Sequence, residues 1–247
     1  MNPTEIIQAE LGSASQMVRA GNYPQAELHL RRYLRSGGAM RQAQDLLHTV
    51  TRAYGMEENF RLSETRAVAR PGHRYLLIKA WGYGFWSDVH HVLGQLLLAE
   101  LTQRTPIVHW GSNSLFGDGS GGEAFRLYFE PVNALELAHL PQQLSIYPPK
   151  WTRENLADEN VNKWEGQYSR NAAQFSFQRD EDLVVSDFYM TLSSLIPWIA
   201  PDSKYYGKSD DELYADLFAR HLKPLPGIEA RVDDFYLQHM AQRGWVA

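Results

Sequence analysis

Hydrophobic residues recur at helical spacing along the first part of the chain. They predict three helices, over residues 3–20, from Pro24 to the pair Gly37-Gly38, and over residues 40–54. An apolar residue at every third or fourth position lines one face of a helix, which is the basis of the prediction. Gly55 is expected to end the third helix as its C-cap. The N-terminal part is therefore predicted to be all-helical.

The second of these helical segments resembles the middle of a tetratricopeptide repeat. It carries Gly21, Tyr23, Ala26 and Leu30 in the order in which that repeat uses small residues to let paired helices approach closely. The match covers one repeat, whereas a stable solenoid usually needs about three. Two interpretations stay open: a helical hairpin packed on the next domain, which we favour, or a groove that binds a protein partner.

A different pattern begins at residue 74, where short apolar runs alternate with a longer amphipathic segment. Residues 74–81 form a continuous apolar run, which is typical of a strand buried on both faces. Residues 88–103 repeat apolar positions at i, i+3 and i+4, with Ser87 or Asp88 as the expected N-cap. Residues 107–110 read as a second strand. Strand, helix and strand in this order predict a βαβ unit with parallel strands.

Further elements follow the same scheme. Residues 143–147 and 182–188 are predicted to add strands to the sheet, and residues 210–222 and 227–243 to form two closing helices. The predicted fold class is α/β: a Rossmann-like parallel sheet, preceded by an all-α appendage.

We expect three parts along the chain: a helical appendage at residues 1–58, a linker at 59–73 and the Rossmann-like domain at 74–247. Composition narrows the chemistry. The chain has 247 residues, a formal net charge of -5 and no cysteine, so disulfides and thiolate metal sites are excluded. No basic stripe indicates nucleic acid, and no signal peptide or membrane-spanning run is present. We expect a cytoplasmic protein.

The segment GYGFWSD, residues 82–88, lies at the predicted strand-to-helix corner. A glycine-rich turn before a helix directs backbone N–H groups toward one point, and ligands of open parallel sheets bind at this edge. A dinucleotide site would need a third glycine, where Ser87 stands, and an acidic end to the second strand, where the chain reads HWGSN. A phosphate cradle is therefore disfavoured, and a sugar-binding lip or a tight aromatic turn remain open.

The neighbouring histidines His90 and His91 invite a metal hypothesis. Adjacent helical residues diverge by about 100°, so the pair does not share one helix face as residues at i and i+4 would. We expect no metal.

Aromatic residues make up 12% of the chain. Trp151 and Trp164 lie in a long polar stretch, residues 141–181, with little periodicity. Long irregular segments in compact domains are usually functional. These aromatic side chains are expected either to stack on sugar rings or to anchor the segment to the core.

Two blocks of sequence resemble the α-1,6-fucosyltransferase family, which includes the bacterial nodulation-type chitooligosaccharide enzymes and the eukaryotic core fucosyltransferases. Residues 104–132 read RTPIVHWGSNSLFGDGSGGEAFRLYFEPV, which is similar to the family's R-T-x-x-x-x-W strand and its following F-F-E-P-V-like block. Residues 217–240, LFARHLKPLPGIEARVDDFYLQHM, resemble its I-K-P-x-P-x-I-x-A-R-I-D segment. The two blocks occur in the family's order.

The resemblance implies a GT-B-like glycosyltransferase made of two Rossmann-like halves. In the family the C-terminal half binds GDP-fucose and the N-terminal half contributes to the acceptor side. The family's H-x-R donor motif does not occur here, because the chain ends at residues 244–247, where the strand before that motif would begin. We therefore expect the acceptor-side half, without the donor-binding domain and inactive by itself.

By the same resemblance, a nucleotide-sugar donor such as GDP-fucose is expected only with the full-length form, and no cofactor is expected for this chain. The expected partners are a glycan or another hydroxyl acceptor, and a protein that binds the N-terminal helices. The alternative function is a non-catalytic interaction module on a degenerate α/β scaffold. No catalytic residue is assigned. The residues expected to line the acceptor side of the cleft are Gly82, Gly84, Phe85, Trp86, Ser87, Asp88, His90, Trp110 and Asn113.

Overall fold

The computed structural model describes most of the chain. The described residues are 3–57, 74–111, 114–148, 150–159, 179, 181–186 and 189–241. Several predictions fall outside them: the linker at residues 59–73, the site residue Asn113, the aromatic Trp164 and the chain end at residues 244–247.

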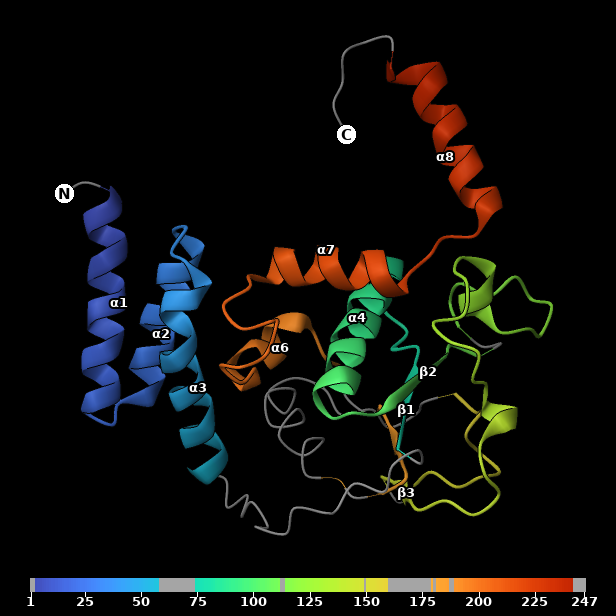
Figure 1. The fold of residues 1–247 in the computed structure, drawn as a ribbon, viewed down its shortest axis with the longest axis horizontal. Helices are drawn as coiled ribbons and strands as arrows, with labels where there is room; N and C mark the ends of the chain where they lie inside the picture. Colours follow the sequence, from blue (N-terminus) through green and yellow to red (C-terminus); the bar gives the residue numbers. More distant parts are fainter. Residues whose placement is uncertain are drawn as a thin grey trace.

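The predicted N-terminal helices are present as α1 (Pro3–Arg19), α2 (Tyr23–Arg35) and α3 (Met40–Glu57). They lie together at one end of the molecule (Figure 1). The C-cap prediction for Gly55 is wrong, because α3 continues through it to Glu57. A glycine inside a helix costs only about 0.5–1 kcal/mol relative to alanine, which the packing of a helix can offset.

These helices share a small core of their own. Its buried members are mostly small or flat side chains, which let the helices approach closely: Ala14, Ala26, Leu30, Tyr33, Ala43 and Val50. Gly21, in the turn between α1 and α2, has a φ of 71°, a conformation that glycine adopts without strain. The helical prediction is confirmed, while the tetratricopeptide relationship stays a prediction.

A parallel sheet forms the centre of the α/β part (Figure 1). Its strands are β1 (Tyr75–Lys79), β2 (Thr105–His109), β3 (Ile146–Tyr147) and β4 (Leu183–Val185), in the order β2-β1-β4-β3. All neighbouring pairs are parallel. The predicted α/β class with a Rossmann-like parallel sheet is confirmed.

The helix of the βαβ unit is α4 (Phe85–Leu101). It begins at Phe85, with Gly84 as N-cap, and no side chain caps its first turn. The expected capping by Ser87 or Asp88 is therefore wrong. Asp88 instead lies inside the first turn, where its carboxylate binds the preceding loop.

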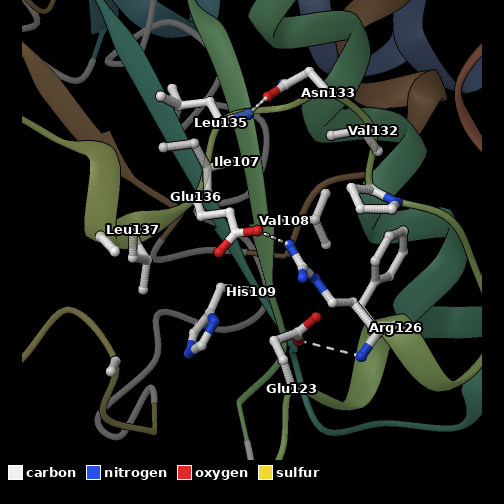
Figure 2. A pocket seen from close by; sticks show the side chains of 14 residues that line it. Ile107, Val108, His109, Glu123, Arg126, Val132, Asn133, Leu135, Glu136 and Leu137 are labelled. Atoms are coloured by element: carbon white, nitrogen blue, oxygen red, sulfur yellow. Dashed lines mark hydrogen bonds and ion pairs between the residues drawn. The ribbon is translucent and has the colours of Figure 1, made fainter.

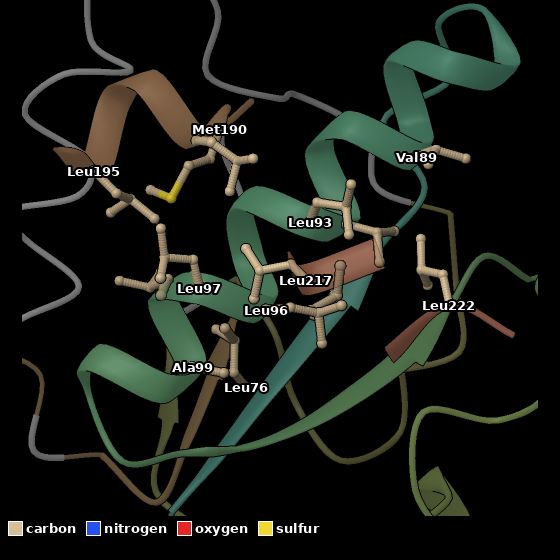
Figure 3. Packing of buried hydrophobic residues seen from close by; sticks show 14 of the residues in the cluster. Leu76, Val89, Leu93, Leu96, Leu97, Ala99, Met190, Leu195, Leu217 and Leu222 are labelled. Atoms are coloured by element: carbon tan, nitrogen blue, oxygen red, sulfur yellow. The ribbon is translucent and has the colours of Figure 1, made fainter. Parts of the chain in front are cut away.

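Helix α4 is the centre of the larger hydrophobic core. Leucines from successive turns, Leu93, Leu96 and Leu97, are buried against the sheet and against Leu195 and Leu217 (Figure 3). A run of apolar residues on several faces is expected for a helix covered on more than one side.

Shorter elements connect the sheet to the last helices. They are η1 (Ala124–Leu127), η2 (Leu137–His139), α6 (Leu192–Leu195), η4 (Ile196–Trp198), α7 (Asp210–His221) and α8 (Pro226–His239). Helix α7 begins with a capping box between Ser209 and Glu212. Helix α8 extends away from the sheet and has no buried residue (Figure 1). Within the described ranges, no helix combines the length and the apolar character needed to cross a bilayer.

One buried amide joins the N-terminal helices to the α/β part. Gln44 of α3 is fully buried; its Nε2 donates to the Ile196 carbonyl, and its Oε1 accepts from the Gly207 amide at 3.0 Å. A buried amide needs partners for both of its ends. The face of α3 that carries Gln44 is thus committed to packing on the α/β part.

Gly94→Ala is expected to destabilise the protein by about 1–3 kcal/mol, through overpacking. A Cβ at Gly94 would lie 2.8 Å from the Met190 carbonyl oxygen, which is a backbone atom that cannot easily move. Chemical denaturation followed by circular dichroism measures the change. Gly12→Ala in α1 is the matched control: a Cβ there meets nothing within 4 Å, so the substitution should stabilise by about 0.5–1 kcal/mol. Equal effects of the two would contradict the close packing of α4.

Candidate functional site

The turn after β1 is held by one carboxylate. Asp88 is fully buried, and its Oδ1 accepts from the backbone amides of Trp81 at 3.0 Å and Gly82 at 3.1 Å. Gly82 has a φ of 86°, which glycine adopts without strain. The predicted strand-to-helix corner is thus a rigid turn, and the Asp88 side chain supports it from inside.

The same arrangement occurs after β2. Trp110 is almost fully buried, and Gly111 has a φ of 74°. Glu123 Oε1 accepts from the amides of Trp110 at 2.6 Å, Gly111 at 3.3 Å and Phe125 at 3.1 Å. Each of the two strands therefore ends in a Trp-Gly pair whose amides bind one carboxylate from farther along the chain. The repeated dipeptide is the signal in the sequence that could have revealed this.

Aromatic side chains cover the corner on both sides. Phe85 packs edge-on against Tyr128, with ring centroids 4.9 Å apart. Tyr83 contacts the ring of Tyr189 at 5.7 Å and remains half-exposed. Trp86, in the first turn of α4, is 60% exposed. We call Tyr83 and Trp86 the aromatic lip.

The remaining predicted site residues separate into different surroundings. The Ser87 carbonyl accepts from the Tyr189 hydroxyl at 3.3 Å. His90 is exposed, with its ring 4.9 Å from that of Tyr214. His91 is fully buried, and its Nδ1 accepts from the Met190 amide at 3.2 Å. The two histidines diverge as expected, and in the described part of the chain no group of three His, Asp or Glu residues could hold a metal ion.

A pocket of about 340 Å³ lies beside the end of β2 (Figure 2). Its lining comes from the end of β2, η1, the loop at residues 131–138 and Ala157. The polar side chains include His109, Glu123 and the ion pair of Arg126 with Glu136, whose Nη2 and Oε1 are 2.6 Å apart. None of these residues was predicted for the site. Its volume is at the lower end of the roughly 300–1,000 Å³ of small-molecule sites.

A buried lysine controls the electrostatics at the strand ends. Lys79 of β1 is 3% exposed and pairs in register with His109 of β2. Its Nζ donates to the Leu156 carbonyl at 2.6 Å and lies 5.0 Å from the centroid of the Trp151 ring. Burial lowers the pKa of Lys79 to about 8, although Asp158 and Glu123 oppose the shift. The sequence left two roles open for Trp151, stacking on a sugar or anchoring its segment to the core. Trp151 is buried, which favours the anchoring role.

The pocket histidine and glutamate are shifted toward their neutral forms. Burial, together with the Lys79 charge, lowers the pKa of His109 to about 4, although a backbone hydrogen bond with Ala157 opposes the shift. Burial raises the pKa of Glu123, although the backbone amides that it binds oppose this change. At neutral pH the imidazole of His109 is therefore uncharged and can either donate or accept a hydrogen bond.

No protein-family model matches the chain, and no curated protein matches it. Two similar solved structures are the fucosyltransferase NodZ from Bradyrhizobium, at 20% identity and a TM-score of 0.47, and NodZ alpha-1,6-fucosyltransferase soaked with GDP-fucose, at 18% identity and a TM-score of 0.44. The alignments cover 68% of this chain, but only 57% and 56% of the NodZ chains. Both are fucosyltransferases, as in the family that the two sequence blocks resemble.

The pKa of His109 predicts a pH dependence of stability. The unfolded imidazole, with an ordinary pKa near 6.5, takes up a proton at pH 5 that the folded protein does not. Stability is therefore lost as the pH falls from about 6.5 toward 4, by up to about 2 kcal/mol at pH 5. His109→Gln should lose less free energy of unfolding than the wild type between pH 7 and pH 5, measured in urea.

Two further measurements test the cause. Between pH 7 and pH 8 the wild type and His109→Gln should differ by a constant amount, because the imidazole is neutral in both states. In Lys79→Met, NMR titration should show the pKa of His109 rising, since the neighbouring positive charge is gone. A parallel decline of wild type and His109→Gln toward pH 5 would contradict the assignment.

Proposed function

We propose that this chain is the acceptor-side part of a fucosyltransferase-like glycosyltransferase, which transfers a sugar from a nucleotide-sugar donor to a hydroxyl of a glycan. The single observation that carries the proposal is the aromatic lip, Tyr83 and Trp86, exposed on a rigid turn at the carboxyl end of the inner strand β1. Ligands of open parallel sheets bind beyond this edge. The two sequence blocks that resemble the fucosyltransferases supply the reaction class.

The lip suits a sugar because its rings are both exposed and held in place. The flat face of a tryptophan can pack against the C–H groups of a pyranose, while the hydroxyls stay hydrated. The carboxylate of Asp88 fixes the turn before any ligand arrives, so less ordering entropy is lost on binding. A glycan bound here would lie across the corner at residues 82–88.

In the full-length form we propose inverting, metal-independent transfer. A general base would deprotonate the acceptor hydroxyl while the nucleotide leaving group is stabilised electrostatically. The two sequence blocks resemble a family that uses GDP-fucose, and we propose GDP-fucose as the donor. We also propose the division into an appendage at residues 1–58, a linker at 59–73 and a sugar-transferring domain at 74–247.

The alternative is a protein-interaction module that uses the N-terminal helices. The observed contact of Gln44 with Ile196 and Gly207 gives one face of α3 a packing role inside the chain. A binding partner would have to use faces of the three helices other than the one that carries Gln44. Protein capture by residues 1–57 without any glycan binding by the chain would favour this alternative.

Trp86→Ala is expected to weaken the binding of a chitooligosaccharide by about twofold to twelvefold, because an aromatic contact contributes about 0.5–1.5 kcal/mol. Isothermal titration of the chain measures the affinity. Phe235→Ala is the matched control, because Phe235 is 58% exposed, close to the exposure of Trp86, but lies on α8. It should leave the affinity unchanged.

The same titration tests the acceptor-side assignment. Oligosaccharide binding that is independent of Trp86 would remove the lip from the site. Tight binding of GDP-fucose by this chain, with no binding of oligosaccharide, would show that the chain carries the donor side and would overturn the proposal.

A further inference from the structure

Strand β2 is the outermost strand of the described sheet on its side, so every second peptide group points away from the sheet. The Thr105 amide donates to the Arg74 carbonyl at 2.8 Å, so the peptide groups of Thr105 face β1. This bond decides which residues of β2 face β1 and which face outward. In a parallel pair, the residues that bond to the neighbouring strand alternate with residues whose groups face outward. Pro106, Val108 and Trp110 are the outward-facing residues.

The chain covers the outward groups on both sides of Val108. Pro106 has no N–H, and its carbonyl accepts from Asn133 Nδ2 at 2.5 Å. The Trp110 amide donates to Glu123 Oε1 at 2.6 Å. For Val108, no described group bonds the outward N–H or C=O. One donor and one acceptor of the strand edge are thus left open, at a position half-exposed to solvent.

Val108 lines the pocket beside β2 (Figure 2), so a ligand in the pocket would lie next to the residue that carries these two open groups. One wall of the pocket is apolar, with Pro131, Val132 and Leu135 among its residues. Arg126 and Glu136, which also line the pocket, form an ion pair. A buried or half-buried polar group that lacks a partner favours a ligand that supplies one.

The lining selects an uncharged ligand. Arg126 and Glu136 neutralise each other, and burial together with Lys79 keeps His109 neutral. Glu123 already accepts from three backbone amides, so a charged ligand would lose hydration on entering the pocket without meeting an opposite charge that lacks a partner. A polyol needs no charge, because each hydroxyl both donates and accepts a hydrogen bond.

We propose that this pocket is a subsite for one uncharged pyranose ring. Neighbouring hydroxyls of the ring bind the open N–H and C=O of Val108 and the rim pair Arg126–Glu136, and the C–H face packs on Pro131 and Val132. This inference rests on the proposed function, because it supplies a second sugar position for the same acceptor.

A series of ring contacts links the pocket to the start of α4, which carries the lip residue Trp86. Phe125 lines the pocket and packs against Phe129 at 5.2 Å between ring centroids, and Phe129 stacks on Phe85 at 6.2 Å. Phe85 is followed by Trp86 of the lip.

The test is an NMR titration of the chain labelled with ¹⁵N-valine and ¹⁵N-tryptophan, with methyl glucoside, diacetylchitobiose and glucuronic acid as probes. Val108→Ile identifies the Val108 amide signal. We expect both neutral probes to shift the Val108 amide and to slow its hydrogen exchange, because it gains a partner, and glucuronic acid to shift it far less.

Val132→Trp should fill the pocket and weaken binding at Val108 by at least about tenfold, as a bulky group does in a site of this size. Val232→Trp is the matched control, because Val232 is exposed on α8. It should leave the shifts unchanged, and the amides of the core residues Val184 and Val185 report that both variants fold.

The outcomes separate the two proposals. Shifts of the Trp86 indole by diacetylchitobiose without any change at Val108 would overturn the pocket and leave the proposed function standing. The absence of any sugar binding at either place would overturn both. Equal shifts with glucuronic acid would overturn the preference for an uncharged ring.

Discussion

The position of the whole candidate site depends on the carboxylate of Asp88. It binds the amides at the end of β1 from inside the first turn of α4, so one group defines where the strand stops and how the helix starts. Without that contact, the buried N–H group of Trp81 would lose this acceptor, at a cost of about 1–3 kcal/mol. The turn exposes Tyr83 and Trp86 because the chain beneath them is fixed. Glu123 holds the end of β2 in the same way.

Local pattern was sufficient to predict the elements that bury many apolar residues. The run at residues 74–81 and the amphipathic stretch after Asp88 gave β1 and most of α4, because burial of a strand or helix face leaves a period in the sequence. The predicted start of α4, with Ser87 or Asp88 as N-cap, lies about one turn after the observed start at Phe85. The capping rule assumes that the side chain accepts from N–H groups two or three residues later, in the helix. Asp88 instead accepts from Trp81 and Gly82, which precede the helix.

The pocket could not be predicted for a related reason. Its polar groups come from separate segments, and Arg126, Glu136 and His109 meet only because η1 and the loop at residues 131–138 fold over the edge of β2. No spacing marks them. The electrostatic state of His109 depends equally on Lys79, which is adjacent only through the parallel register of β1 and β2. Of the two lip residues, Trp86 was expected from the sequence and Tyr83 was not, although both belong to the glycine-rich corner at residues 82–88.

The protected edge of β2 also bears on how the protein behaves among other proteins. An exposed strand edge is a template on which a second chain can add a strand, and such pairing leads to aggregation. Here Pro106 removes one donor, Asn133 occupies one acceptor and Glu123 occupies another donor, so within the described part of the chain the open stretch is a single residue long. A β-strand cannot propagate from one residue. The same hydrogen bonds that protect this edge leave only the groups of Val108 open. Two groups are enough to bind a small molecule but too few to pair with a second β-strand.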